Sequence, residues 1–287
     1  MHTSNKRFVF ITGVSSGIGY ALLNALTKNG FHVIGTTRKE ADADRLKNEF
    51  DELFYPIVMD ITLEEDLFNA SKKASKICGE DGLFALINNA GIAMGGPMKY
   101  IDVVKLRNQF EINVFGVVAL TQQLLPLLER GRQHTFGGKI LNMSSVSGLI
   151  TSAFLGPYSA SKFALEAISE AMRIEFAPFG IQVVILEPGA IKTPIWQKAL
   201  TQVDEFGETE YGPHLHKLQG QLDKIVQNAV SMDVLVQLVL NILSTKQPKA
   251  RYLIVKKPFM FKLFVKFMPA SWKNSFQSRI MNTKDIQ

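Results

Sequence analysis

The segment that most constrains the fold of this chain is a glycine-rich turn near the N-terminus, between a strand pattern and a helix pattern. The apolar run Arg7–Ile11 predicts a buried strand. It leads into Thr12-Gly13-Val14-Ser15-Ser16-Gly17-Ile18-Gly19, and helical periodicity begins at Tyr20. This order places free backbone N–H groups at a helix N-terminus, where a phosphate binds. The spacing is G-x-x-x-G-x-G rather than G-x-G-x-x-G, and a plain tight turn is the alternative.

Strand and helix patterns alternate along the rest of the chain. Strands are predicted at residues 7–11, 32–36, 54–59, 83–87, 139–143, 181–186 and 252–255. Helices are predicted at 18–29, 40–50, 63–78, 98–129, 157–177 and 232–244, and Pro126 should kink the fourth helix or begin its last turns. Most strands are apolar on both faces, which is typical of a parallel sheet covered on both sides. We therefore expect one α/β domain over residues 1–255, followed by a C-terminal extension over 256–287.

Composition fits an ordinary globular protein, with 46% hydrophobic and 20% charged residues among 287. The single cysteine, Cys78, excludes an intrachain disulfide and is expected to be a small buried residue. No signal segment and no uninterrupted apolar run of membrane-spanning length is seen. We expect a cytoplasmic protein.

The positive charge is concentrated at the C-terminal end. Residues 246–287 hold ten Lys or Arg and one acid, whereas the rest of the chain holds 22 basic and 25 acidic residues. The net charge of +6 therefore comes from the tail, and the near-neutral body does not indicate nucleic-acid binding.

The strongest chemical signal is Tyr158-Ser159-Ala160-Ser161-Lys162. Residues four apart share one face of a helix, and an ammonium near a phenol lowers its pKa from about 10 toward the working pH. Ser145 lies thirteen residues before Tyr158, directly after an apolar strand pattern. Its hydroxyl is placed to donate a hydrogen bond to a substrate oxygen that the tyrosine also reaches.

These motifs, together with Asn88-Asn89-Ala90-Gly91, occur in the order and spacing of the short-chain dehydrogenase/reductase family, which the chain resembles over about residues 7–255. The resemblance implies a single Rossmann-type doubly wound parallel sheet with helices on both faces. It implies hydride transfer between a nicotinamide and a carbonyl carbon. Tyr158 would move the proton, Ser145 would polarise the carbonyl, and Lys162 would tune Tyr158 and hold the nicotinamide ribose.

The resemblance gives Asn113 the role of supporting a proton-relay water near the lysine. A capped or kinked helical turn is the alternative for that residue. Ser144 is the neighbour of Ser145, and the spacing to Tyr158 favours Ser145. The intact set of four residues favours an enzyme over a non-catalytic cofactor-binding regulatory or membrane-interaction protein.

The residues after the second predicted strand favour NADP over NAD. An acid here would bind the adenosine ribose, but the chain has Thr37 and then Arg38, whose guanidinium suits a ribose 2′-phosphate. Ser15 and Lys39 are candidate helpers. The alternative is a solvated surface arginine, and the glycine turn itself contains no basic residue.

The remaining cofactor contacts are implied by the family pattern. Asp60 would hold the adenine amino group, or it is simply an acid at a helix N-terminus. The segment Pro188-Gly189-Ala190-Ile191-Lys192-Thr193 would touch the nicotinamide end. The turn residues Gly13, Ser15, Ser16, Gly17, Ile18 and Gly19 would bind the phosphates, and Asn89, Ala90 and Gly91 would line the adenosine side.

A substrate lid is expected at about residues 195–225. Its large residues either line an apolar pocket or belong to the core; they are Trp196, Leu200, Phe206, Tyr211 and Leu215. His214 and His216 lack partners at metal-ligand spacing, so we expect no metal. The residues after Gly91 and the end of the body resemble the hydroxysteroid and retinol dehydrogenase branch. That implies a small to bulky apolar alcohol or carbonyl substrate, of steroid, retinoid or fatty type, and a homodimer or homotetramer.

The segment Lys256–Pro269 combines lysines with large apolar residues and has no acid. If it is helical, Lys262 and Lys266 share one face, and Phe261, Phe264, Val265 and Met268 another. This pattern is typical of a helix at a membrane interface, so peripheral membrane contact through the tail is one hypothesis. Packing over the lid or against a dimer partner is the other.

Overall fold

A computed structural model describes residues 6–191, 204–227, 229–267 and 269 of the chain. Thr193, Trp196, Leu200 and Met268 lie outside the described residues, as do residues 270–287 of the predicted extension.

The centre of the fold is a seven-stranded sheet, and every neighbouring pair of its strands is parallel. The order is β3-β2-β1-β4-β5-β6-β7. The strands are β1 Phe8–Ile11, β2 His32–Thr37, β3 Phe54–Val58, β4 Leu83–Asn88, β5 Lys139–Met143, β6 Gln182–Pro188 and β7 Arg251–Ile254. The predicted doubly wound sheet is therefore confirmed. The strand order runs outward from β1 to β3 on one side and from β4 to β7 on the other, so it reverses between β1 and β4. Ligands of such sheets usually bind at this point, in a crevice at the carboxyl ends of the strands.

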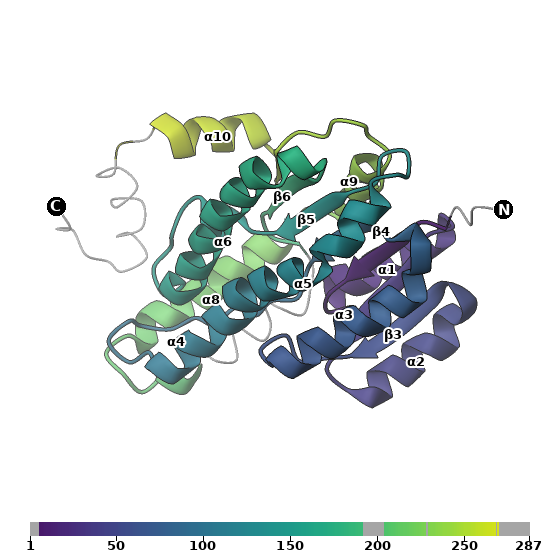
Figure 1. Ribbon diagram of the computed structural model, residues 1–287. Coiled ribbons are helices and arrows are strands. Elements are labelled where there is room, and N and C mark those ends of the chain that lie inside the picture. Colours follow the sequence, from purple (N-terminus) through teal and green to yellow (C-terminus); the bar gives the residue numbers. More distant parts are fainter. Residues whose placement is uncertain (1–5, 192–203, 228, 268, 270–287) are drawn as a thin grey trace.

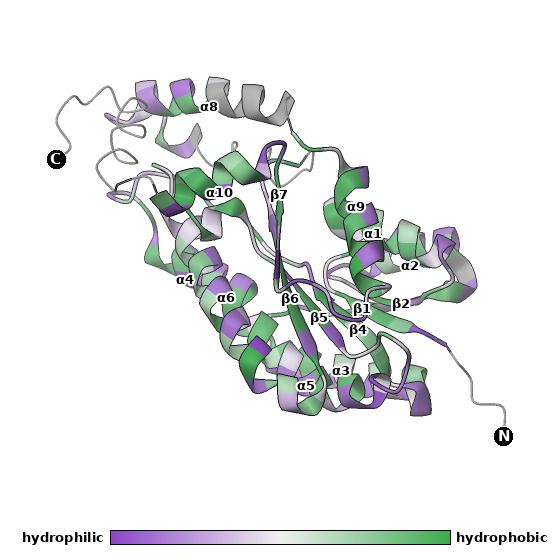
Figure 2. Cartoon of the chain, turned by 90° about the horizontal axis from the view of Figure 1, so that it is seen from above, coloured by the Kyte–Doolittle hydropathy of each residue, from purple (hydrophilic) through white to green (hydrophobic). Residues whose placement is uncertain are grey.

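Helices cover both faces of the sheet (Figures 1 and 2). Each face has its own hydrophobic core. Side chains of α1 Gly17–Lys28, α2 Glu40–Phe50 and α9 Met232–Leu243 pack on one face. Those of α3 Glu64–Cys78, α5 Gly116–Gly131 and α6 Gly156–Glu175 pack on the other. Cys78 is buried in the second core, as predicted, and burial raises its pKa to about 12. Short 3₁₀ helices lie at Asp51–Leu53, Gly79–Asp81, Val146–Gly148, Ala177–Phe179 and Asp204–Phe206.

The predicted helix over 98–129 begins later and is not uniform. Asp102 caps α4 Val103–Phe110 by accepting a hydrogen bond from the Val104 N–H at 2.7 Å. A π-helical segment, Glu111–Phe115, then joins α4 to α5, and α5 continues past Pro126. Within the described part of the chain, this continuous 29-residue helix is the one long and apolar enough to cross a membrane, with a mean hydropathy of 1.3. Half of its apolar window is buried and its leucines fill the second core, which identifies a core helix.

Two further helices lie outside the regular alternation. Helix α8 Gly212–Gln227 occupies part of the predicted lid, where the sequence analysis predicted no helix. Helix α10 Pro258–Phe267 follows β7 and lies at the outside of the molecule (Figure 1).

Helix α10 has two apolar sides, one facing the rest of the chain and one exposed. Phe261, Phe264 and Val265 are half-buried and so face the rest of the chain. The exposed apolar residues are Phe259, Met260, Leu263 and Phe267. At 100° per residue these four form a continuous stripe, and Lys262 and Lys266 flank it on one side. The predicted apolar side is therefore present but faces the rest of the chain, which fits the packing alternative, and a second apolar stripe is exposed.

A chain of buried amides and hydroxyls fixes α5 and α6 against the middle of the sheet. Asn88 on β4 donates to the Asn142 Oδ1 at 2.8 Å and to the Thr121 Oγ1 at 3.1 Å. Asn142 on β5 donates to the Ser169 Oγ on α6 at 2.8 Å. Buried polar groups are costly unless paired, so these contacts specify how α6 lies on the sheet.

Candidate active site

A cleft of about 480 Å³ opens at the carboxyl ends of the strands. It collects most of the residues singled out in the sequence: Gly13, Ser15, Ser16, Gly17, Ile18, Arg38, Asp60, Asn89, Ala90, Gly91, Ser145, Tyr158, Lys162, Pro188, Gly189 and Ile191. Gly19 and Asn113 do not line it, and Thr193 lies outside the described residues. Residues far apart in the sequence thus meet at the position where the strand order reverses.

The glycine turn is built so that backbone lines the cleft. Gly13 and Gly17 have φ values of 71° and 61°, which side chains other than glycine rarely adopt. A Cβ on Gly19 would lie 2.1 Å from the Gly13 carbonyl oxygen and 2.6 Å from the Asn89 Nδ2. Helix α1 begins at Gly17, and the Ser16 side chain forms no capping hydrogen bond. The N–H groups of the first turn therefore face the cleft as donors for an anion.

Two threonines that the sequence analysis did not select hold this turn in place. The Thr12 Oγ1 accepts hydrogen bonds from the N–H groups of Asn89 at 2.9 Å and Ala90 at 2.8 Å. The Asn89 Nδ2 donates back to the Thr12 carbonyl at 2.9 Å. The Gly13 N–H donates to the Thr36 Oγ1 at 3.1 Å. The ends of β1, β2 and β4 are locked together, and the threonine directly before Gly13 was the visible signal.

Beside the basic end of the cleft lies one cation that the sequence analysis did not select. Arg38 and Lys39 are exposed and line the cleft, and Arg38 forms no ion pair among the described residues. Arg45, which the sequence analysis missed, donates to the Ser15 carbonyl at 3.1 Å and pairs with Asp42 at 3.5 Å. This guanidinium supports the glycine turn from α2.

Asp60 lines the cleft, but one of its oxygens already has a structural role. The Asp60 Oδ1 accepts hydrogen bonds from the Thr62 N–H at 2.9 Å and the Thr62 Oγ1 at 2.7 Å. These bonds shape the turn that precedes α3, which begins only at Glu64, so Asp60 is an acid of the turn rather than of the helix N-terminus.

The three groups predicted to act on the substrate lie at the inner end of the cleft. Tyr158 and Lys162 come from the first two turns of α6, and Ser145 follows β5. The Lys162 Nζ donates to the Met143 carbonyl at 2.8 Å and lies 5.8 Å from the centre of the Tyr158 ring. The Ser145 Oγ accepts from the Ser147 N–H at 3.1 Å. All three side chains are buried.

Burial is the main cause of the pKa shifts of Tyr158 and Lys162. It raises the pKa of Tyr158, and a hydrogen bond with the Ser145 hydroxyl acts in the opposite direction. The sequence analysis predicted a lowered tyrosine pKa, which was wrong for this structure because burial outweighs that hydrogen bond. Burial also lowers the pKa of Lys162 to about 8, against the opposing charge of Glu166.

Asn113 lies in the π-helical segment and is completely buried. Its Nδ2 donates to the Ile92 carbonyl at 2.9 Å and to the Ser161 Oγ at 3.0 Å, and its Oδ1 accepts from the Ile92 N–H at 2.9 Å. Asn113 thus ties the loop after Gly91 to α6, and π segments are frequent at functional sites. The predicted alternative of an irregular helical turn also describes what is seen.

The described part of the lid shares a small core with the segment before α6. Phe206, Tyr211 and Leu215 pack against Phe154 of that segment. The three residues therefore belong to this core and do not line the cleft.

Exposed polar contacts tie the lid to the body. Lys99 pairs with Glu210 at 2.6 Å, and Lys105 pairs with Glu205 at 2.9 Å. The described ranges contain no group of three metal-ligating side chains around His214 and His216 or elsewhere.

Comparison with known proteins shows to which family this fold and this cleft belong. A family model for short chain dehydrogenases matches residues 7–204. An NADPH-dependent 3-dehydrocapnine reductase from Ornithobacterium rhinotracheale is 38% identical over 92% of this chain and 93% of its own length. A 17-beta-hydroxysteroid dehydrogenase type 6 from Bos taurus is 32% identical over 88% of this chain and 81% of its own.

A solved structure agrees with this relation. A short-chain dehydrogenase from Streptomyces avermitilis is similar with a TM-score of 0.77 and 28% identity, covering 99% of this chain and 100% of its own. The predicted family and its hydroxysteroid and retinol dehydrogenase branch are confirmed by these relatives, which include a retinol dehydrogenase 16 from Mus musculus at 29% identity.

Proposed function

We propose that this chain, which belongs to the short-chain dehydrogenase/reductase family of NAD(P)-dependent oxidoreductases, uses NADP(H) to interconvert a carbonyl and an alcohol on an apolar substrate. The observation that carries the proposal is the meeting of Ser145, Tyr158 and Lys162 at the inner end of a cleft whose outer part is an anion-binding turn.

The residues of the cleft fit this dinucleotide. The uncapped first turn of α1 suits the pyrophosphate, and the exposed guanidinium of Arg38 suits a 2′-phosphate. The cofactor use of the 3-dehydrocapnine reductase supports NADP(H) over NAD. NADP(H), when bound, exchanges a hydride with the substrate carbon.

The side chains of the chain handle the proton and the oxygen. We propose that Tyr158 donates the proton to the carbonyl oxygen during reduction and accepts it during oxidation. The Ser145 hydroxyl donates a hydrogen bond to the same oxygen as negative charge develops there. Lys162 favours the ionised form of Tyr158 and holds the cofactor ribose. Asn113 holds the segment that supports a relay water near Lys162.

The substrate is proposed to be apolar and bulky, of steroid, retinoid or fatty type. Relatives whose names include a retinol dehydrogenase and a hydroxysteroid dehydrogenase support this class, and the reductase at 38% identity supports the direction of reduction. A substrate of that size is expected to contact the lid next to the nicotinamide end of the cleft.

Oxidation of NADPH in the presence of a panel of carbonyl compounds tests the proposal. The panel contains 3-dehydrocapnine, a retinaldehyde, steroid ketones and short polar ketones, each also assayed with NADH. We expect turnover with NADPH and an apolar member. NADPH binding without turnover of any member would favour the non-catalytic, regulatory alternative.

We propose that the protein forms a homodimer or homotetramer through the outer face of α6. Phe163 and Ile174 are exposed there, eleven residues apart and therefore on one side of the helix, with exposed Ala167 and Ala171 between them. Phe115 on the adjoining π segment is also exposed. An apolar stripe of this kind fits a second copy of the chain. A monomeric mass in light scattering at micromolar concentration would contradict this.

We further propose that residues 1–255 form the catalytic unit in the cytoplasm and that residues 256–287 attach it peripherally to anionic membranes. The exposed stripe of α10, with Phe259 at 73% and Phe267 at 67% exposure beside lysines, suits a lipid interface. Co-sedimentation with vesicles should be salt-sensitive and should require anionic lipid. Phe259→Ser combined with Phe267→Ser should reduce vesicle binding. Full-length protein that does not bind the vesicles would leave α10 as a packing element.

A further inference from the structure

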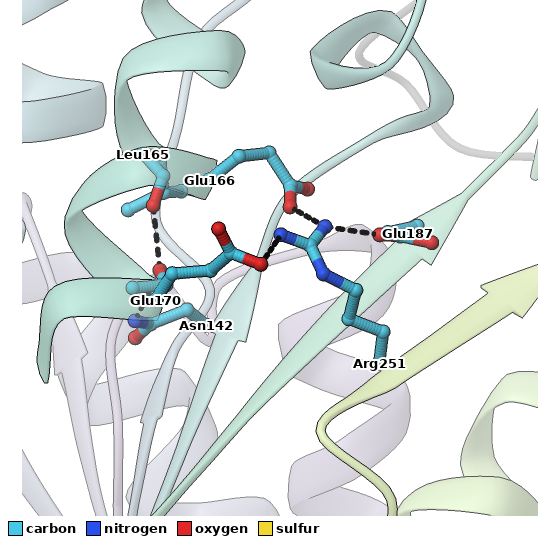
Figure 3. A network of polar contacts seen from close by, with 7 residues as sticks. Asn142, Leu165, Glu166, Glu170, Glu187 and Arg251 are labelled. Carbon is cyan, nitrogen blue, oxygen red and sulfur yellow. Dashed lines mark hydrogen bonds and ion pairs between the residues drawn. The ribbon is translucent and has the colours of Figure 1, made fainter. Parts of the chain in front are cut away.

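Beside α6, the helix that carries Tyr158 and Lys162, one arginine contacts three carboxylates (Figure 3). The guanidinium of Arg251 on β7 contacts Glu166 on α6, Glu187 on β6 at 2.8 Å and Glu170 on α6 at 2.6 Å. The side chains of Glu166 and Glu187 are only 7% and 4% exposed, whereas that of Glu170 is 52% exposed. The buried part of the network is therefore one cation shared by two acids.

The charges in this network do not balance. One guanidinium faces three carboxyl groups, and a buried unpaired carboxylate is strongly unfavourable. Burial and the neighbouring Glu187 raise the pKa of Glu166, while Arg251 and the Ser144 hydroxyl lower it. The net effect is a raised pKa of Glu166, and Arg251 opposes the uptake of a proton by this carboxylate.

Glu166 connects the network to the catalytic group. It lies one helical turn after Lys162, on the same face of α6, and its charge favours the protonated form of Lys162. Glu187 directly precedes Pro188 and Gly189, which line the cleft. The groups that face Glu166 are Lys162 and Glu170 on α6, Glu187 on β6, Arg251 on β7 and Ser144 after β5.

We propose that Arg251 and Glu166 are positioning residues for the reaction: Arg251 clamps α6 to β6 and keeps the buried Glu166 ionised, and Glu166 in turn holds Lys162 as an ammonium beside Tyr158. The inference rests on the proposed function, because it assigns the charge state of the same lysine.

The test compares four variants over pH. Glu166→Gln keeps the shape and removes the charge, so the pKa of Lys162 should fall further below about 8. The alkaline limb of kcat/KM for NADPH-dependent reduction should then move to lower pH by about one unit, a tenfold change in the protonation equilibrium. Arg251→Met should move it the same way because Glu166 becomes protonated, and Arg251→Lys should restore it. Glu170→Gln is the matched control and should leave the limb in place, since its exposed carboxylate lies two turns from Lys162.

A second readout does not require turnover. The pH dependence of NADPH binding, followed by fluorescence, reports the charge of Lys162 next to the cofactor and should shift in the same order among the variants. The inference would be overturned if neither the alkaline limb of kcat/KM nor the pH dependence of NADPH binding shifts in folded Glu166→Gln. A shift of equal size in Glu170→Gln would overturn it as well. Wild-type protein that binds NADPH and turns over no substrate would instead contradict the proposed function, and the binding curves would still decide the role of Glu166.

Discussion

Replacing Gly19 by alanine should damage the cofactor site without touching any group that performs chemistry. The added methyl carbon would lie 2.1 Å from the Gly13 carbonyl oxygen, which is backbone, and 2.6 Å from the Asn89 amide nitrogen. Relieving such a contact requires a displacement of about 1 Å between α1 and the turn, since a carbon and an oxygen normally stay more than 3 Å apart.

The size of the effect follows from two opposing contributions. Overpacking of this kind destabilises a fold by about 1–3 kcal/mol, and the better helix propensity of alanine returns at most about 1 kcal/mol. We therefore expect the free energy of unfolding to fall by up to about 2 kcal/mol. Misaligning one charge-assisted hydrogen bond to phosphate loses a further 1.5–3 kcal/mol of binding, so the Kd for NADPH should rise about 10- to 100-fold.

Fluorescence titration with NADPH and calorimetric melting measure the two quantities separately. Gly220→Ala in α8 is the matched control, because no atom lies within 4 Å of its added Cβ and the position is helical. It should leave the Kd unchanged and stability unchanged or slightly higher. A folded Gly19→Ala protein with a Kd within twofold of the wild type would refute the assignment of this turn to the cofactor.

Three other substitutions have clear expected outcomes. Tyr158→Phe should reduce turnover to below a few per cent while the Kd for NADPH stays within about twofold, because only the proton donor is lost; larger residual turnover would remove Tyr158 from the acid–base role. Arg38→Asp should weaken NADPH binding about 10- to 100-fold, because a charge-assisted contact worth about 1.5–3 kcal/mol is lost, and it should leave NADH binding little changed. An unchanged preference between the two cofactors would show that Arg38 is only a surface residue. Burial lowers the pKa of Lys139 to about 8 from 10.5, so the unfolded chain binds more protons between these pH values and stability rises with pH there. Lys139→Met should remove part of that rise in urea unfolding between pH 8 and 10.5, and an unchanged slope would contradict the assignment.

The strands could be predicted almost residue by residue because each is a short apolar run between glycines and polar turns. The exception is β6, which continues to Pro188 and includes Glu187. A buried acid in an otherwise apolar strand was a visible signal, but its partner Arg251 lies 64 residues away, and single-sequence patterns do not reveal such pairs.

The catalytic group could be predicted for a local reason. Tyr158 and Lys162 are one helical turn apart, so their spacing alone brings them together. The pKa of Tyr158 could not be predicted, since it depends on how deeply tertiary packing buries the ring. The π-helical segment around Asn113 was foreseen only as an irregular turn. Helix α8 was missed although Leu215, Leu218, Leu222 and Ile225 recur at helical spacing, because Gly212, Pro213 and Gly220 favour a loop.

The way the lid is fastened has an evolutionary consequence. Lys99–Glu210 and Lys105–Glu205 are exposed ion pairs, and each contributes only about 0–1 kcal/mol. The apolar contacts of the lid with Phe154 are also separate from the two cores of the sheet. Mutations in the lid can therefore exchange its inner surface without unfolding the sheet or α6, the helix that carries Tyr158 and Lys162. If the lid contacts the substrate, as proposed, selection can change substrate preference with little effect on the reaction, and a duplicated gene needs few mutations to acquire a new specificity.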